Sequence, residues 1–150
     1  LKAKGIASMG ERENLSLISE DLGKRKLVAV MAGAELWNQN AKTVIVAEGL
    51  VMYLPSNAVQ EMFRQCASIS GIGSRIAFSY IPSDADGRPD TGRWTGLMLW
   101  LLKVTGEPWI WTMRPRQLDL FLEETGWRNA PELAKSTEKY GVEFYAVATR

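Results

Sequence analysis

The stretch TVIVAEGLVMYLP, residues 43–55, combines the pattern of a buried strand with a carboxylate. Four apolar residues lead up to Glu48, Gly49 follows directly, and a second apolar run ends at Pro55. A continuous apolar run with polar flanks is typical of a parallel strand covered on both faces. Glu is rarely fully buried unless a partner compensates its charge. The pattern therefore predicts a strand that carries a carboxylate at its carboxyl end.

Strand and helix patterns alternate on both sides of this stretch. The expected strands cover residues 14–19, 42–49, 74–82 and 141–150. The expected helices lie within residues 24–37, between Pro55 and the GIG at 71–73, near 94–104, and from 114 to a C-terminal glycine at 126. Ser56 or Asn57 is the expected cap of the second helix. Such alternation predicts an α/β fold with a mainly parallel sheet and right-handed crossovers.

The composition limits the chemistry open to the chain. With 150 residues, 18 basic and 17 acidic, and a net charge of +1, it can form one core and gives no electrostatic reason to expect nucleic-acid or membrane binding. No apolar stretch reaches the ~20 residues of a membrane span. One cysteine and no histidine exclude an intrachain disulfide, a Cys/His zinc site and histidine-based triads within this chain. We expect no metal and a cytoplasmic location.

Two carboxylates follow expected strands, where ligands bind in open α/β sheets. Asp21 is either a helix cap or an acceptor for the amino group or hydroxyl of a nucleoside. Glu48 is either a salt-bridge partner or a contact for a polar or cationic ligand, and the adjacent glycine favours a tight turn there. Cys66 lies on an apolar helix face and is expected in the core. The apolar segment between Trp94 and Trp111 either lines a pocket or packs on the sheet.

The block VIVAEGLVMYLP, residues 44–55, resembles the signature of leucine carboxyl methyltransferases and their bacterial relatives, which are S-adenosylmethionine-dependent O-methyltransferases. Further pieces occur in the matching order, and the resemblance extends from about Asn14 onward. These pieces are EDL at 20–22, SRIAFSY at 74–80, TGEPWIW at 105–111, LDLFLEETGW at 118–127 and the final strand.

The resemblance implies S-adenosyl-L-methionine as cofactor, with Asp21 and Leu22 at the adenine and Glu48 also in contact with the cofactor. No catalytic residue is assigned. The methyl acceptor would be a carboxylate or hydroxyl of a small molecule or protein, and a carboxylate needs no general base, whereas a hydroxyl does. Position near strand ends makes four aromatic residues the expected substrate contacts: Tyr53, Tyr80, Trp109 and Trp111.

The resemblance also implies a Rossmann-like methyltransferase sheet, in the family order 3-2-1-4-5-7-6, whose last strand is antiparallel. The glycine-rich loop and strands 1 and 2 have no counterpart in this sequence. We therefore expect residues 1–150 to be the C-terminal part of a single methyltransferase domain, completed by another segment or another chain, and to bind cofactor weakly or not at all alone. The alternatives are a catalytically inactive interaction domain and a different α/β enzyme that uses Asp21 and Glu48 as acid and base.

Overall fold

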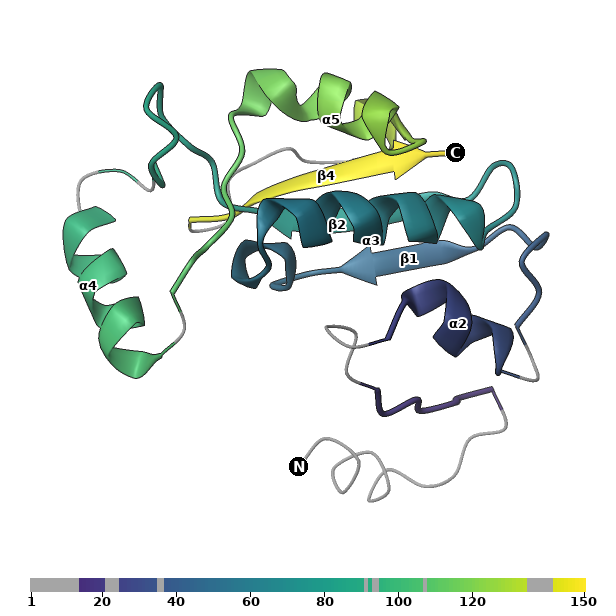
Figure 1. Ribbon diagram of the computed structural model, residues 1–150. Coiled ribbons are helices and arrows are strands. Elements are labelled where there is room, and N and C mark those ends of the chain that lie inside the picture. Colours follow the sequence, from purple (N-terminus) through teal and green to yellow (C-terminus); the bar gives the residue numbers. More distant parts are fainter. Residues whose placement is uncertain are drawn as a thin grey trace.

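The computed structural model describes residues 14–20, 25–34, 37–90, 92, 95–106, 108–134 and 142–150 (Figure 1). Its centre is a four-stranded sheet of β1 (Val44–Ala47), β2 (Arg75–Tyr80), β3 (Arg128–Asn129) and β4 (Phe144–Thr149). The strand order is β1-β2-β4-β3. β1 and β2 are parallel, and β4 is antiparallel to both of its neighbours. This arrangement corresponds to the 4-5-7-6 part of the expected methyltransferase sheet, and it confirms the antiparallel last strand.

Among the described residues, four α-helices accompany the sheet: α2 (Leu27–Ala32), α3 (Ser56–Ser68), α4 (Thr95–Thr105) and α5 (Leu118–Glu124). Short 3-10 turns cover Val51–Tyr53, Pro115–Gln117 and Pro131–Leu133. α3 and α5 lie on the same side of the sheet, whereas α4 projects away from it (Figure 1). The four helices fall where the apolar periodicity predicts them. Pro55, rather than Ser56 or Asn57, is the N-cap residue of α3, and no side chain caps that helix.

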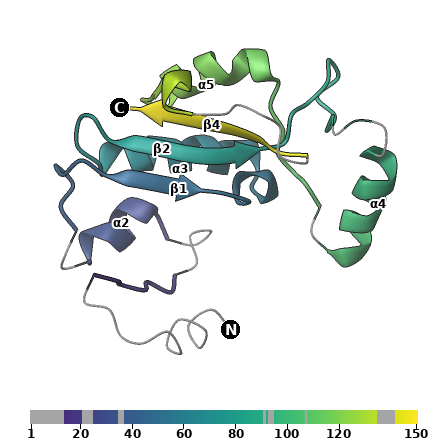
Figure 2. The same cartoon turned by 180° about the vertical axis from the view of Figure 1, so that it is seen from behind.

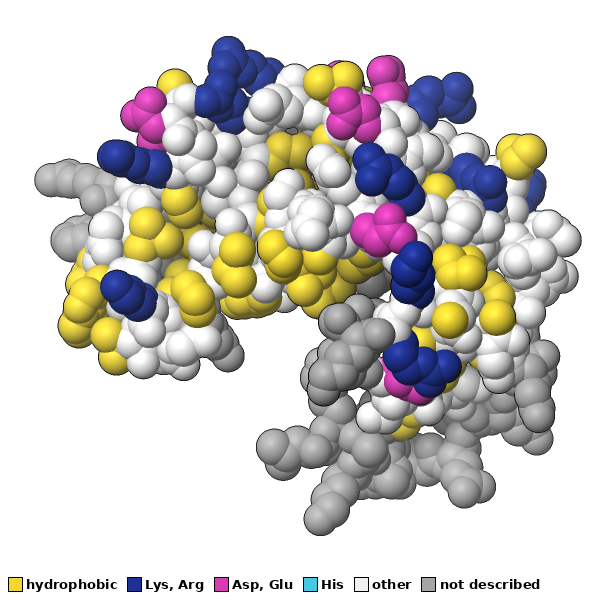
Figure 3. Space-filling view, in the orientation of Figure 1, with side chains coloured by type: hydrophobic (Ala, Val, Ile, Leu, Met, Phe, Trp, Pro, Cys, Tyr) yellow, Lys and Arg dark blue, Asp and Glu magenta, His cyan; other side chains and the backbone are white. Residues whose placement is uncertain are grey.

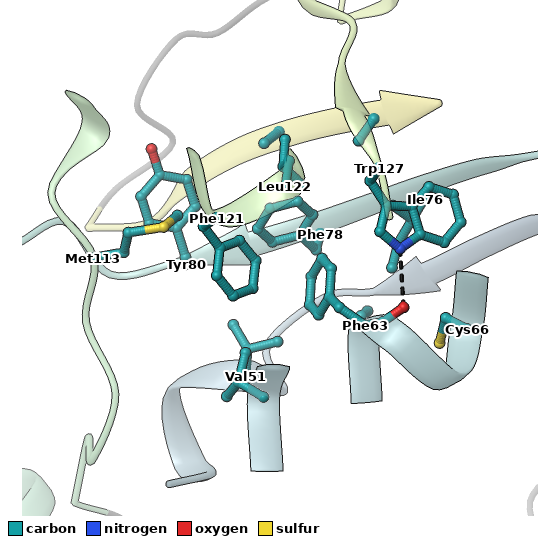
Figure 4. Packing of buried hydrophobic residues seen from close by; sticks show 14 of the residues in the cluster. Val51, Phe63, Cys66, Ile76, Phe78, Tyr80, Met113, Phe121, Leu122 and Trp127 are labelled. Atoms are coloured by element: carbon teal, nitrogen blue, oxygen red, sulfur yellow. Dashed lines mark hydrogen bonds between the residues drawn. The ribbon is translucent and has the colours of Figure 1, made fainter. Parts of the chain in front are cut away.

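The hydrophobic core fills the space between one face of the sheet, the core face, and the helices α3 and α5 (Figure 4). Phe63 of α3 is fully buried and meets Phe78 and Phe121 edge to face, with both pairs of ring centroids 4.9 Å apart. The indole N–H of Trp127 donates a hydrogen bond to the Phe63 carbonyl at 3.0 Å. Cys66 is buried in this cluster, as expected, and burial raises the pKa of its thiol to about 11.

The opposite face of the sheet, the open face, carries the side chains of Val44, Val46, Ala77, Tyr145 and Val147. No described α-helix lies over this face (Figure 2). Val44 is 72% exposed and Val46 is 68% exposed. The expectation that both faces of β1 are covered is therefore wrong for the described chain. The apolar run reflects a strand that has a covering layer on one side only.

The strand expected over residues 14–19 is also absent, because residues 15–20 form no regular structure and are exposed. Alternation of apolar and polar residues indicates a strand only where a neighbouring strand can accept its hydrogen bonds. No described strand lies beside this segment. None of the helices in the described ranges is long and apolar enough to cross a membrane.

Candidate functional site

Glu48 lies at the carboxyl end of β1, in the turn between this strand and the 3-10 turn Val51–Tyr53. Gly49 has a φ of 61°, a left-handed conformation that glycine adopts without steric cost. Its backbone N–H donates a hydrogen bond of 2.8 Å to the hydroxyl oxygen of Ser79, a fully buried residue of β2. The turn is therefore attached to the adjacent strand, and the backbone position of Glu48 is fixed by the sheet.

Glu48, Ser79 and Tyr145 form a row across three neighbouring strands. The register pairs Ala47 with Phe78 and Ser79 with Tyr145, so continuing β1 by one residue brings Glu48 beside Ser79. The phenol of Tyr145 donates a hydrogen bond to Oε1 of Glu48 at 3.4 Å. The strand end thus presents a carboxylate and a phenol on the open face.

The pKa of the Tyr145 phenol is raised above its ordinary value, first by desolvation and then by the negative charges of Glu143 and Glu48 and the hydrogen bond to Glu48. At neutral pH the phenol is protonated and acts as the donor in this contact. One oxygen of Glu143, Oε2, is buried without a hydrogen-bond partner among the described residues. This end of the sheet is therefore rich in acceptors.

A pocket of about 450 Å³ opens over the same row. Its lining comprises Val46, Glu48, Ala77, Phe78, Ala134, Tyr145, Ala146 and Val147. Most of this surface is apolar, and the carboxylate and phenol stand at one end of it. Such a lining suits a ligand that combines an apolar or flat part with a cationic or hydrogen-bond-donating group.

The other sequence-predicted site residues are not all brought to this pocket. Asp21 and Leu22 lie outside the described residues, so their role as adenine contacts stays a prediction. Tyr80 is 2% exposed and packs against Phe78 and Phe144, and burial raises the pKa of its phenol to about 12. The structure places this side chain in the core.

The other three aromatic residues lie along the segment that leaves β1 and the segment that follows α4. Tyr53 is exposed and Trp109 is half-buried, whereas Trp111 is buried against Phe121. The backbone N–H groups of Ile110 and Trp111 both donate to the Met52 carbonyl, at 2.7 and 3.1 Å. A separate pocket of about 290 Å³, lined by Tyr53, Gly106, Pro108 and Ile110, lies at this junction. Tyr53 and the segment that contains Trp109 are thus neighbours. Their junction lies at a different pocket from the one that Glu48 lines.

α4 carries large apolar side chains that the core does not cover. Leu97, Trp100, Leu101 and Val104 are each more than half exposed. Figure 3 shows hydrophobic side chains gathered over this helix, on the left of the view. Of the two interpretations that the sequence leaves open for the segment between Trp94 and Trp111, packing of α4 on the sheet does not occur in the described structure.

Sequence reasoning did not identify Tyr145 or Ser79 as site residues. In β4, Phe144, Ala146 and Ala148 lie on the core face, and Tyr145 lies on the other face. Only the strand order could have shown that this other face meets Glu48, 97 residues earlier in the chain. Within the described residues, no cluster of His, Cys, Asp and Glu could hold a metal ion.

Residues 1–67 match the family model of leucine carboxyl methyltransferases, a segment that includes Asp21, Leu22 and Glu48. A relative from Mycolicibacterium paratuberculosis, provisionally named an S-adenosyl-L-methionine-dependent methyltransferase, is 29% identical over 84 residues. The alignment covers 56% of this chain and 31% of that protein. The chain thus spans about a third of the length of this curated relative.

Solved structures of methyltransferases share the fold. An O-methyltransferase family protein from Burkholderia thailandensis matches with a TM-score of 0.66 at 11% identity, over 99% of this chain and 40% of its own. Magnesium protoporphyrin IX methyltransferase from Synechocystis PCC 6803, with bound SAH, matches with a TM-score of 0.56 at 14% identity, over 99% of this chain and 57% of its own.

These comparisons confirm the resemblance to leucine carboxyl methyltransferases, and the cofactor in the relative's name is the one that the resemblance implies. The chain covers only part of each solved structure, which agrees with an α/β sheet that is incomplete.

Proposed function

We propose that this relative of the leucine carboxyl methyltransferases supplies one part of an S-adenosyl-L-methionine-dependent O-methyltransferase, with Glu48 as a cofactor contact. The carrying observation is the fixed position of Glu48 at the carboxyl end of β1, where the Gly49–Ser79 hydrogen bond holds its turn beside a pocket. That position is the usual ligand-binding edge of an open α/β sheet.

The chemistry of the carboxylate suits this cofactor. S-adenosyl-L-methionine supplies an electrophilic methyl group on a cationic sulfur, together with an ammonium group and ribose hydroxyls. A carboxylate accepts hydrogen bonds from such donors and is attracted to the positive charge. Asp21 and Leu22 would contact the adenine. The contribution of this chain to the rate would be orientation, because holding an acceptor oxygen in line with the methyl group removes most of the entropic barrier.

The methyl acceptor in this proposal is a carboxylate or hydroxyl of a small molecule or a protein in the cytoplasm. The chain has no histidine to serve as general base, which favours a carboxylate because it is already ionised. Tyr53 and Trp109 would contact the acceptor, because neither is fully buried and the segments that carry them are joined by hydrogen bonds to the Met52 carbonyl. Tyr80 and Trp111, which lie in the core, would shape the acceptor site from beneath.

A second segment or chain would complete the sheet, with residues 1–150 as the C-terminal part of one methyltransferase domain. β1 pairs with β2 on one side and has no described partner on its other edge. In the family's strand order, strand 1 lies at that edge. Unpaired strand edges readily accept another strand, and the exposed Val44 and Val46 offer apolar surface for the layer that would cover it.

Calorimetric titration with S-adenosylhomocysteine tests this function on two forms of the protein, the 150-residue chain and the chain joined to the segment that completes the sheet. We expect weak or no binding to the first and micromolar binding to the second. In the second form, Glu48→Gln should weaken binding about tenfold, as expected for loss of a charge-assisted hydrogen bond. Glu123→Gln, an exposed carboxylate of α5, is the matched control and should have no effect. Equal affinities for wild type and Glu48→Gln would refute the role of Glu48.

The exposed strand edge also favours a second candidate, a catalytically inactive interaction domain. In that case the completing segment would bind to β1, yet the assembled protein would not bind S-adenosylhomocysteine. The same titration therefore separates the two functions.

A further inference from the structure

We propose that Tyr145 is a positioning residue, which holds the Glu48 carboxylate in the orientation that the cofactor requires. This inference rests on the proposed function. It assigns a role to β4, a strand that lies next to β2 and not next to β1.

The geometry of the row explains how a residue two strands away reaches Glu48. Ser79 stands between Glu48 and Tyr145 in this row, and its side chain is small and fully buried. The Ser79 hydroxyl already accepts the Gly49 N–H, so it supports the backbone of the turn. The long side chain of Tyr145 extends along the open face to Oε1 of Glu48. Backbone and side chain of the same turn are thus held by two different strands.

The contact leaves Glu48 able to bind a ligand. A carboxylate accepts hydrogen bonds at two oxygens, and Tyr145 donates to one of them, Oε1. The phenol has an ordinary pKa of 10.0 and is therefore protonated at neutral pH, and desolvation and the nearby Glu143 and Glu48 raise that pKa further. It therefore acts as a donor to one oxygen, and the second oxygen of the carboxylate can accept from a ligand in the pocket that Glu48 and Tyr145 both line.

Fixing a side chain before the ligand arrives lowers the entropic cost of binding. Immobilising one flexible side chain costs roughly 0.5–1.5 kcal/mol, which corresponds to about a two- to tenfold change in affinity. Removing the phenol hydroxyl should therefore weaken binding by that factor, and only while Glu48 is present to be positioned.

A double-mutant cycle on S-adenosylhomocysteine affinity tests this coupling, in the form of the protein that binds in the preceding experiment. Tyr145→Phe should weaken binding about two- to tenfold in wild type and leave it unchanged in the Glu48→Gln background. Thr149→Val is the matched control, because it removes a hydroxyl from the same strand and face but beside Arg75, away from Glu48. If Tyr145→Phe has no effect on a wild type that binds, or the same effect in both backgrounds, the positioning role is refuted. If wild type does not bind, the proposed function itself is refuted.

A second measurement needs no cofactor. Carbon NMR of the Tyr145 ring during a pH titration should show that Glu48→Gln lowers the pKa of the phenol, because the substitution removes a negative charge beside it. Glu123→Gln should leave that pKa unchanged. An unchanged pKa in Glu48→Gln would show that the two side chains are not in contact, and would overturn the inference.

Discussion

The two faces of the sheet are built from the same strands and have opposite environments. On the core face Ile76 is fully buried and Phe78 is 2% exposed, beneath α3 and α5. On the open face Val44 and Val46 of the neighbouring strand are mostly exposed, and Glu48 and Tyr145 meet beside them. Side chains alternate between the faces along each strand, so one residue of each adjacent pair faces the core and the next lies on the open face.

This difference separates stability from binding. The core face holds the aromatic contacts and the buried Trp127 hydrogen bond, which stabilise the packing of the helices on the sheet. The open face holds the candidate site and the exposed apolar surface that a completing segment would cover. Substitutions on the core face should therefore change the free energy of unfolding even when the chain is by itself. Substitutions on the open face should have an effect only when a ligand or a completing segment is present.

The largest effect is expected for Phe63→Ala, which should lower the free energy of unfolding by about 3–5 kcal/mol. Phe63 is fully buried and joins the rings of Phe78 and Phe121, so its removal leaves a cavity between sheet and helices. Urea denaturation followed by circular dichroism measures the change. Trp100→Ala, an exposed aromatic residue of α4, is the control and should change stability little. A loss below about 1 kcal/mol would contradict this account of the core.

Cys66 gives the core face a pH dependence. Burial raises the pKa of the folded thiol from 9.0 to about 11, so the folded state keeps its proton where the unfolded state loses it. The stabilising contribution is complete below pH 9 and is lost as the pH rises through about 11. It amounts to roughly 2–3 kcal/mol. Urea denaturation between pH 8 and 11 should show a decline in stability that is smaller in Cys66→Ala. Equal slopes in both proteins would refute the burial of this thiol.

Trp127→Phe should cost about 1–3 kcal/mol, because it leaves the buried Phe63 carbonyl without its indole donor and removes part of the packed ring. Thermal unfolding of the chain measures the loss. The comparison is Trp100→Phe, which changes an exposed indole and should leave the midpoint in place. A midpoint for Trp127→Phe equal to that of wild type would mean that this hydrogen bond contributes nothing.

The sequence predicts the core face better than the open face, for reasons visible in particular residues. The apolar run before Glu48 and the periodicity of α3 and α5 are local patterns, and they place strand, carboxylate and helices correctly. The segment 14–19 has the alternation of a strand, but the formation of a strand depends on a distant partner. The same limit hides Tyr145, because strand order alone brings it to Glu48.

The position of a residue along a strand can be predicted more easily than the face to which its side chain points. Tyr80 ends β2, as the sequence indicates, yet its side chain points into the core toward Phe78 and Phe144. Whether such a residue faces a ligand or the interior depends on which face the helices cover. That choice is made by the packing of α3 and α5 and has no local signature in the sequence.

The smallest expected effect is that of Val46→Ala in the chain alone, where it should change the free energy of unfolding by less than about 0.5 kcal/mol. Val46 is 68% exposed, so shortening it removes little buried surface. In the protein joined to its completing segment, the same substitution should cost roughly 2 kcal/mol, because the side chain then lies between two layers. Val59→Ala, at a fully buried position of α3, should cost a similar amount in both forms. If Val46→Ala has the same small effect in both, the open face is not the surface that the completing segment covers, and the functional division between the two faces fails for β1.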